Sequence, residues 1–471
     1  MTDKTPNQIN VENMLVRMEE VETRSGSSTM CLAKWLQSTV YLMNGHTHSC
    51  HHPSAHKIPI SEIKANPSAL HNTKHKIKVR EEMLQGERPS ECQYCWNVEN
   101  LPGKHLSDRT YKSSDVQWAH PHLDTVIASG NGIDIAPTYL EVMFDNTCNF
   151  KCMYCTPDIS SKWMEEIERF GPYPTSTKLG SLIWLKDIGK MPIPRKEENP
   201  YIDAFWEWWP ELYQSLNTFR ITGGEPLLSK NTWRVLDYIK ANPRKDFTIA
   251  INTNMQVPDE LITKLISYYN EIAPHVKSFD IFTSCEAQGK QADYIRYGMD
   301  YNKFMSNCRR LLAETNARLN FMVTFNALSV TTFTAFLKDI WQLRVDFNED
   351  DADNRIPMMI SYLRWPQFQD VRILPNNIKE PFAHQVKTFV QAHTRNTSPD
   401  QAGRFYLEEI DQVERLCEYM HEPLDDAYLK RQHTDFGIFF REYDDRRDVR
   451  FDDVFPELSD FYTFCIEQYN G

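Results

Sequence analysis

From Thr138 to Leu363 the chain alternates between segments patterned as β-strands and segments patterned as amphipathic helices. The strand-like segments are short and rich in β-branched and aromatic residues, whereas the helical segments repeat apolar residues every three or four positions. Strands that alternate with helices build a parallel α/β sheet, and ligands bind at the carboxyl ends of its strands. We expect strands at Tyr139–Phe144, Thr218–Thr222, Phe247–Asn252, Ser278–Thr283, Leu319–Asn326 and Pro357–Leu363, and helices at Thr232–Ala241, Asp259–Tyr269 and Lys303–Glu314.

The residues on either side of this region differ in character, so we expect three domains. A length of 471 residues exceeds what one hydrophobic core usually organises. Within the core, residues 157–215 are rich in aromatic residues and interrupt the alternation, and we interpret them as an insertion that caps the mouth of the sheet. The predicted domains are 1–137, irregular with candidate helices at Ile60–Asn66 and Lys76–Gln85; 138–375, the α/β core; and 376–471, a charged helical extension.

The charge and the cysteine content limit the classes of function. The formal net charge is −13, which argues against a nucleic-acid partner bound through a broad basic surface. Apolar runs are too short to cross a bilayer, and Met1–Glu20 is polar and acidic, unlike a secretory signal. We therefore expect a cytoplasmic protein without a membrane partner. Disulfides are disfavoured there, so the eleven cysteines should be buried side chains or metal ligands.

Three cysteines, Cys148, Cys152 and Cys155, follow the first expected strand within eight residues. Clustered thiolates select zinc or an iron–sulfur cluster. A [4Fe-4S] cluster has four irons, so three cysteines would leave one iron open to another ligand. A structural zinc site with a borrowed fourth ligand, or cysteines that only pack in a core, are the competing interpretations.

The second expected strand ends in Gly223-Gly224-Glu225-Pro226. A Gly-Gly pair by itself indicates only a turn. At the carboxyl end of a strand, however, two glycines allow a ligand to approach the backbone closely, and Glu225 can accept a hydrogen bond from an ammonium group.

The cysteine loop resembles the signature of the radical S-adenosylmethionine (radical SAM) superfamily, C-x-x-x-C-x-aromatic-C after the first strand of a partial (β/α)6 barrel. Cys148, Cys152, Tyr154 and Cys155 match it position by position. The resemblance implies an α/β fold with a partial (β/α)6, TIM-like barrel and a [4Fe-4S] cluster whose open iron is chelated by the methionyl amine and carboxylate of SAM. One electron then cleaves the sulfonium and gives a 5′-deoxyadenosyl radical, while Tyr154 lies against the adenine.

The later strand ends extend the resemblance. Gly223-Gly224-Glu225-Pro226 is similar to the family's G-G-E-P motif, which holds the methionyl amine. Asn254 stands where the family often has T-N-G, although Met255 replaces the glycine. The family resemblance further implies Ser284 near the ribose or carboxylate, Arg296 on the carboxylate through its guanidinium fork, and Asn326 near the ribose or adenine.

Several of these residues have simpler explanations. A strand-end cap explains Ser284, and a surface ion pair explains Arg296, as well as SAM binding does. Cys285 fits a small buried side chain better than a hydrogen donor or a substrate ligand.

Four more cysteines, Cys31, Cys50, Cys92 and Cys95, precede the core. With Trp35, Gly45 and Trp96 they resemble the SPASM/twitch auxiliary-cluster domain, although that domain usually follows the core. The resemblance implies a second [4Fe-4S] cluster, saturated by four thiolates, for electron transfer or structure. Zinc is the alternative, because four-thiolate zinc sites are common and neutral imidazoles also suit zinc. Histidines surround Cys50, at His46, His48, His51, His52 and His56.

Together these features predict a radical SAM enzyme that abstracts hydrogen from a substrate, for which a peptide or protein is our expectation. An electron donor such as flavodoxin or ferredoxin would reduce the cluster. The alternative is a zinc-stabilised binding or scaffold protein without SAM chemistry. The substrate, the bond formed, the oligomeric state and the role of Cys285 do not follow from the sequence.

Overall fold

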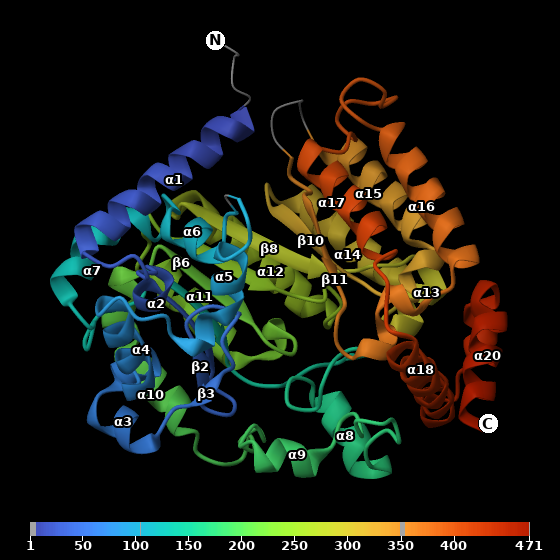
Figure 1. The fold of residues 1–471 in the computed structure, drawn as a ribbon, viewed down its shortest axis with the longest axis horizontal. Helices are drawn as coiled ribbons and strands as arrows, with labels where there is room; N and C mark the ends of the chain where they lie inside the picture. The colour runs from blue at the N-terminus through green and yellow to red at the C-terminus, as the bar shows by residue number, and fades with distance from the viewer. Residues whose placement is uncertain (1–5, 104, 349–353, 471) are drawn as a thin grey trace.

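The computed structural model describes residues 6–103, 105–348 and 354–470 (Figure 1). In these residues a nine-stranded sheet has the order β11-β10-β8-β7-β6-β4-β1-β2-β3, and β5 pairs with β9 separately. The strands are β1 (Gln37–Tyr41), β2 (His46–His48), β3 (His56–Lys57), β4 (Tyr139–Met143), β5 (Lys151–Cys152), β6 (Thr218–Thr222), β7 (Thr248–Asn252), β8 (Ser278–Ser284), β9 (Arg296–Tyr297), β10 (Arg318–Phe325) and β11 (Met358–Tyr362).

The strands of the core follow one another around the sheet in chain order. From β4 through β6, β7, β8 and β10 to β11, each strand pairs in parallel with the next. Successive parallel neighbours of this kind form the (β/α) barrel arrangement, here with six strands of the sheet. The predicted α/β class is therefore confirmed, and all six predicted strands occur within two residues of their expected bounds.

The sheet continues into the N-terminal residues. β1 pairs in parallel with β4, and Val40 of β1 lies opposite Val142 of β4. β2 then pairs antiparallel with β1, and β3 pairs antiparallel with β2. The sequence did not predict β1, because Ser38 and Thr39 interrupt its apolar pattern. The N-terminal helices also have a hydrophobic cluster of their own, which includes Trp35 and Trp96. The domain boundary at residue 137 stays a prediction.

Helices cross over between the parallel strands. Among residues 157–215, α10 links β4 to β6 and packs on the sheet through Trp209, whose ring centroid lies 4.8 Å from that of Phe219. Only α8 and α9 of these helices lie along the lower rim in Figure 1. The helices of residues 6–347 are α1 (Pro6–Ser25), α2 (Ala33–Leu36), α3 (Ile60–Ala65), α4 (Lys74–Leu84), α5 (Gln93–Glu99), α6 (Asp108–Ser113), α7 (Leu123–Ser129), α8 (Ser161–Phe170), α9 (Leu182–Asp187), α10 (Pro200–Ser215), α11 (Lys230–Ala241), α12 (Asp259–Ile272), α13 (Gly289–Ile295), α14 (Tyr301–Glu314) and α15 (Phe333–Phe347).

The C-terminal residues are helical, as predicted, and they protect the edge of the sheet. Glu409 Oε1 accepts a hydrogen bond from Met358 N (2.9 Å), and Gln412 Oε1 accepts one from Ile360 N (2.6 Å). These side chains satisfy N–H groups of β11 that face no further strand. The helices are α16 (Asn376–Gln391), α17 (Leu407–Tyr419), α18 (Asp426–Arg447), α19 (Phe451–Val454) and α20 (Ser459–Asn470).

None of the helices in the described residues combines the length and the apolar character that a bilayer crossing requires.

Replacing Glu409 by Ala should destabilise the protein strongly. The change removes the partner of Arg344, which is 0% exposed and donates to both Glu409 oxygens, and it also removes the acceptor of Met358 N. A buried charge left without its partner costs about 3–5 kcal/mol. Gln412→Ala, which removes one hydrogen bond, should cost about 1 kcal/mol. Thermal denaturation measures the unfolding midpoints of the two variants. Equal midpoints would contradict the role of Glu409 as the partner of Arg344.

Candidate active site

The three cysteines of the core lie on one loop between β4 and α8. Ser161 holds the backbone of Cys148: the Ser161 Oγ accepts a hydrogen bond from Cys148 N and donates one to Cys148 O, at 3.2 Å each. Cys148 Sγ accepts from Phe150 N (3.4 Å), and Cys155 N donates to Cys152 O (2.9 Å). The loop therefore presents three half-buried thiols at the carboxyl end of β4, as the spacing predicted.

Burial dominates the acid–base chemistry of these thiols. It raises the pKa of Cys148 to about 12 and raises the pKa of Cys152 and of Cys155 as well. Thiols in such surroundings stay protonated at neutral pH unless a cation replaces the proton. The donor set thus suits a metal centre that compensates the thiolate charge.

The loop after β6 packs directly on the backbone of the cysteine loop. Glu225 N donates to Thr147 O (2.6 Å). A Cβ on Gly224 would lie only 2.3 Å from Thr147 O and 3.0 Å from Asn146 O, and Gly223 has φ = +125°. We expected these glycines to admit a ligand. The described contacts show that Gly224 admits the cysteine loop itself.

The Glu225 carboxylate joins this contact to the loop after β7. Its Oε1 accepts from Leu227 N (3.0 Å), and its Oε2 accepts from Asn254 N (2.6 Å). Glu225 is 1% exposed, and burial raises its pKa to about 7. Asn254 Nδ2 in turn donates to Asn149 Oδ1 (2.8 Å) in the cysteine loop. Three strand-end loops are thereby tied into one unit.

Met255 shows why a glycine would suit its position. Its backbone has φ = +54°, the left-handed region that costs a side chain about 1–2 kcal/mol. The Met255 side chain is 0% exposed, and burial of an apolar side chain offsets a cost of this size. Met255 can therefore stand where the family often has glycine, and the loop keeps the geometry that positions Asn254.

The remaining predicted residues differ in how free their polar atoms are. Ser284 ends β8 and is half-buried. Asn326 is fully buried, and its amide group serves its own turn: Oδ1 accepts from Leu328 N (2.9 Å) and Nδ2 donates to Thr324 O (3.1 Å). Cys285 is 0% exposed and donates to Ala287 O (3.2 Å), so the expectation of a buried side chain is confirmed.

Arg296 is buried and lies beside Cys152. Its Nε and Nη2 both donate to Glu286 Oε2, at 3.1 and 2.6 Å, and Tyr154 OH donates to Glu286 Oε1 (3.1 Å). The suggestion of a surface ion pair is wrong, because both partners are at most 7% exposed. Sequence reasoning missed Glu286, which follows Cys285 directly and carries no motif of its own.

The four N-terminal cysteines come from separate segments. Cys31 precedes α2, Cys50 follows β2, and Cys92 and Cys95 lie at the start of α5. All four are buried, and the charges of Cys31 and Cys50 add to the effect of burial in raising the pKa of Cys92 and Cys95. Burial raises the pKa of Cys92 to about 12 and that of Cys95 to about 11. The fold therefore brings together the cysteines that the sequence grouped.

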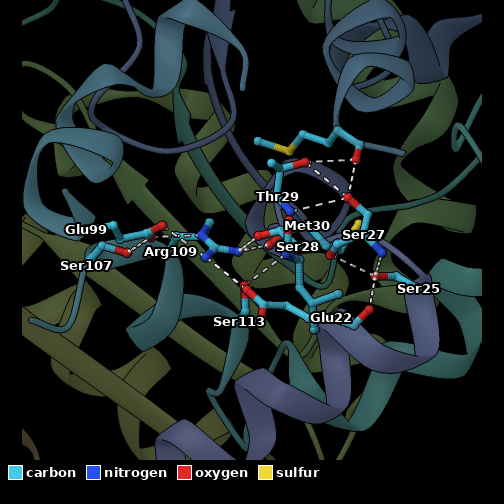
Figure 2. Close-up of polar contacts among 12 residues, drawn as sticks. Glu22, Ser25, Ser27, Ser28, Thr29, Met30, Glu99, Ser107, Arg109 and Ser113 are labelled. Carbon is cyan, nitrogen blue, oxygen red and sulfur yellow. Dashed lines mark hydrogen bonds and ion pairs between the residues drawn. The ribbon is translucent and has the colours of Figure 1, made fainter. Parts of the chain in front are cut away.

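Buried cations accompany these cysteines. Burial alone would lower the pKa of Lys34, but the charges of Cys92, Glu91 and Cys50 raise it above its usual value. Figure 2 shows Arg109, which donates to Glu99, to Glu22 and to the carbonyl oxygen of Met30 (2.9 Å), the residue that precedes Cys31. Neither cation was predicted, since their proximity arises only in the fold.

The histidines around Cys50 are largely engaged elsewhere. His48 Nδ1 donates to Cys50 O (2.5 Å), and His46 Nδ1 to Asn44 O (3.1 Å); burial lowers the pKa of both to about 4. His51 and His52 contact Asp108 Oδ2 at 3.3 and 2.8 Å.

The candidate ligand groups differ in how compact they are. Among the described residues, the one group of three or more candidate ligand atoms that all lie within 4.8 Å of one another is His51, His52 and Asp108. Thiolates on one tetrahedral zinc lie about 3.8 Å apart, because the Zn–S bond is about 2.3 Å. No three cysteine sulfurs of the described residues lie within 4.8 Å of one another.

Residues 142–340, from β4 into α15, match the family model described as the radical SAM superfamily. Over 131 residues the chain is 27% identical to GTP 3′,8-cyclase of Aliarcobacter butzleri (strain RM4018), a match covering 27% of this chain and 30% of that protein. A crystal structure of SuiB from Streptococcus suis bound to S-adenosylmethionine aligns with 10% identity and a TM-score of 0.32, over 77% of this chain and 69% of that chain. The N-terminal cysteines lie outside the family match.

Gly224→Ala should disrupt the cysteine loop. The added Cβ would overlap Thr147 O, so the loop must shift, at a cost of about 1–3 kcal/mol. We expect the variant to lose iron from Cys148, Cys152 and Cys155 after reconstitution, as measured by iron analysis. Gly189→Ala is the control: its φ of +69° makes an added Cβ strained as well, but that Cβ would meet no heavy atom within 4 Å. Iron loading of Gly224→Ala equal to that of the control would contradict the packing argument.

Proposed function

We propose that this chain, whose residues 142–340 match the radical SAM superfamily model, is an enzyme that binds a [4Fe-4S] cluster on Cys148, Cys152 and Cys155 and cleaves SAM reductively. The proposal rests on one observation: three half-buried thiols on a single loop, fixed by Gly224 and Glu225 at the carboxyl ends of β4 and β6. Three thiolates leave one iron of the cluster open. When bound, the cluster supplies one electron to SAM and yields a 5′-deoxyadenosyl radical that abstracts hydrogen from the substrate.

The chain's own residues would orient SAM and exclude water. The loop of Gly223, Gly224 and Glu225 would lie beside the methionyl amine, with the Glu225 carboxylate held by Leu227 N and Asn254 N. The remaining contacts, to the carboxylate, ribose and adenine, are proposed for Tyr154, Asn254, Ser284 and Asn326.

A cavity beside the cysteine loop supports a sizeable substrate. It has a volume of about 410 Å³, and its wall at Thr156–Ile159 continues directly from Cys155. Trp184 of α9 and Trp365, which follows β11, flank it and are 57% and 44% exposed. Exposed tryptophans at a pocket are typical anchors for a partner chain. We propose that the substrate is a peptide or a protein side chain.

We propose a second [4Fe-4S] cluster on Cys31, Cys50, Cys92 and Cys95. Four thiolates saturate it, so it would serve electron transfer or structure. The neighbouring Lys34 and Arg109 would offset its negative charge. Cys50 lies level with the amino end of β1, and Cys148 lies beyond the carboxyl end of β4, which runs parallel to β1. The two clusters would therefore lie at opposite ends of these strands.

Reduction of the SAM cluster requires an electron donor, for which flavodoxin or ferredoxin is our proposal. Thiol-ligated clusters persist in a reducing compartment, so we also propose a cytoplasmic location.

Reconstituted protein with dithionite and SAM should form 5′-deoxyadenosine, measured by liquid chromatography and mass spectrometry. Cys148→Ala should abolish the product, because the cluster loses one of its three protein ligands. Cys417→Ala, which changes a buried cysteine on α17, should keep it. Absence of 5′-deoxyadenosine from fully iron-loaded protein would overturn the proposal and favour a zinc-stabilised scaffold.

Metal analysis tests the second cluster. Anaerobically reconstituted protein should contain about eight irons, four per cubane, and the triple variant Cys148→Ala, Cys152→Ala, Cys155→Ala should keep about four. About four irons and one zinc in the unmodified protein would exclude the second cluster.

A further inference from the structure

Arg296 is attached to the cysteine loop through its backbone. β5 and β9 form a short antiparallel pair in which Cys152 lies opposite Arg296. Next to this pair, Met153 N donates to Ile295 O (2.8 Å). The backbone pairing places the Arg296 side chain close to Cys152 independently of any ligand.

Glu286 fixes the orientation of the guanidinium. Arg296 Nε and Nη2 both donate to Glu286 Oε2, and the two residues are 6% and 1% exposed. This pairing directs Nη1 toward Cys152 Sγ, at 3.9 Å. The guanidinium carbon also lies 5.6 Å from the centroid of the Tyr154 ring. Arg296 is thus surrounded by a carboxylate, a cluster ligand and an aromatic ring.

We propose that Arg296 is a positioning residue for the cluster: it donates an N–H to the Cys152 thiolate and raises the cluster's reduction potential, whereas the Glu286 carboxylate lowers that potential. The inference rests on the proposed function and assigns Arg296 to the cluster, where the family resemblance had implied the SAM carboxylate. Hydrogen bonds to the sulfurs and local charge set cluster potentials, because they stabilise the added electron. The carboxylate of Glu286 opposes this effect and keeps the potential low.

We expect substitutions of Arg296 and of Glu286 to shift the reduction potential in opposite directions. A redox titration followed by electron paramagnetic resonance measures these shifts on reconstituted protein without SAM. Arg296→Gln should shift the potential to more negative values, by about 59 mV if the reduced-to-oxidised ratio falls tenfold. Glu286→Gln should shift it to less negative values. Arg296→Lys, which keeps the charge, should restore part of the difference. The spectrum of the triple cysteine variant is subtracted to remove any second cluster.

Two further measurements separate this role from others. Arg344→Gln removes another buried Arg–Glu pair, away from the cysteine loop, and should destabilise the protein without changing the potential. The dissociation constant for SAM should change less than twofold in Arg296→Gln. Potentials unchanged in Arg296→Gln and Glu286→Gln, with SAM affinity reduced tenfold or more in Arg296→Gln, would overturn the inference. If Arg296→Gln does not fold, the direction in which the reduction potential shifts in Arg296→Lys and in Glu286→Gln tests the inference instead. Failure of unmodified protein to assemble a cluster on Cys148, Cys152 and Cys155 overturns the proposed function itself.

Discussion

The contact between Gly224 and the backbone of Thr147 holds the candidate site together. The loop after β6 can reach the cysteine loop only because residue 224 lacks a side chain, and Glu225 N then donates to Thr147 O at 2.6 Å. The Glu225 carboxylate passes the constraint on to Asn254 N. Three loops from three neighbouring strands are therefore linked into one unit, and this unit determines where the thiols of Cys148, Cys152 and Cys155 lie.

Much of the fold was predictable, because it depends on local pattern. The six core strands are short apolar segments between amphipathic helices, and the parallel order follows from that alternation. β1 was not predictable in this way, since its polar residues are satisfied by a distant side chain: buried Lys76 donates to Ser38 Oγ at 2.8 Å. The pairing of β1 with β4 extends the sheet into the N-terminal residues.

The candidate site was predictable where the chemistry lies in consecutive residues. Spacing alone located the cysteine loop and the Gly223–Glu225 loop at neighbouring strand ends, and the structure brings them together. The partners that control charge were not predictable, because Glu286, Lys34 and Arg109 approach the thiols only through tertiary packing. The roles of Asn254, Ser284 and Asn326 toward SAM stay predictions.

Both cysteine groups combine burial with a nearby cation. Burial favours the neutral thiol and so resists ionisation, whereas Arg296 beside Cys152, and Lys34 and Arg109 beside the N-terminal cysteines, favour thiolate. A metal cluster that replaces the protons fits this balance, because its ligands are thiolates and its net charge is negative.

The proposed chemistry requires that the cluster on Cys148, Cys152 and Cys155 has an open iron that takes SAM as its ligand. Electron–nuclear double resonance on the reduced cluster, with SAM carrying ¹⁵N in the methionyl amine, tests it most directly. We expect a ¹⁵N coupling in the unmodified protein that disappears in Cys148→Ala. A fully loaded, reduced cluster that shows no ¹⁵N coupling with saturating SAM would contradict it.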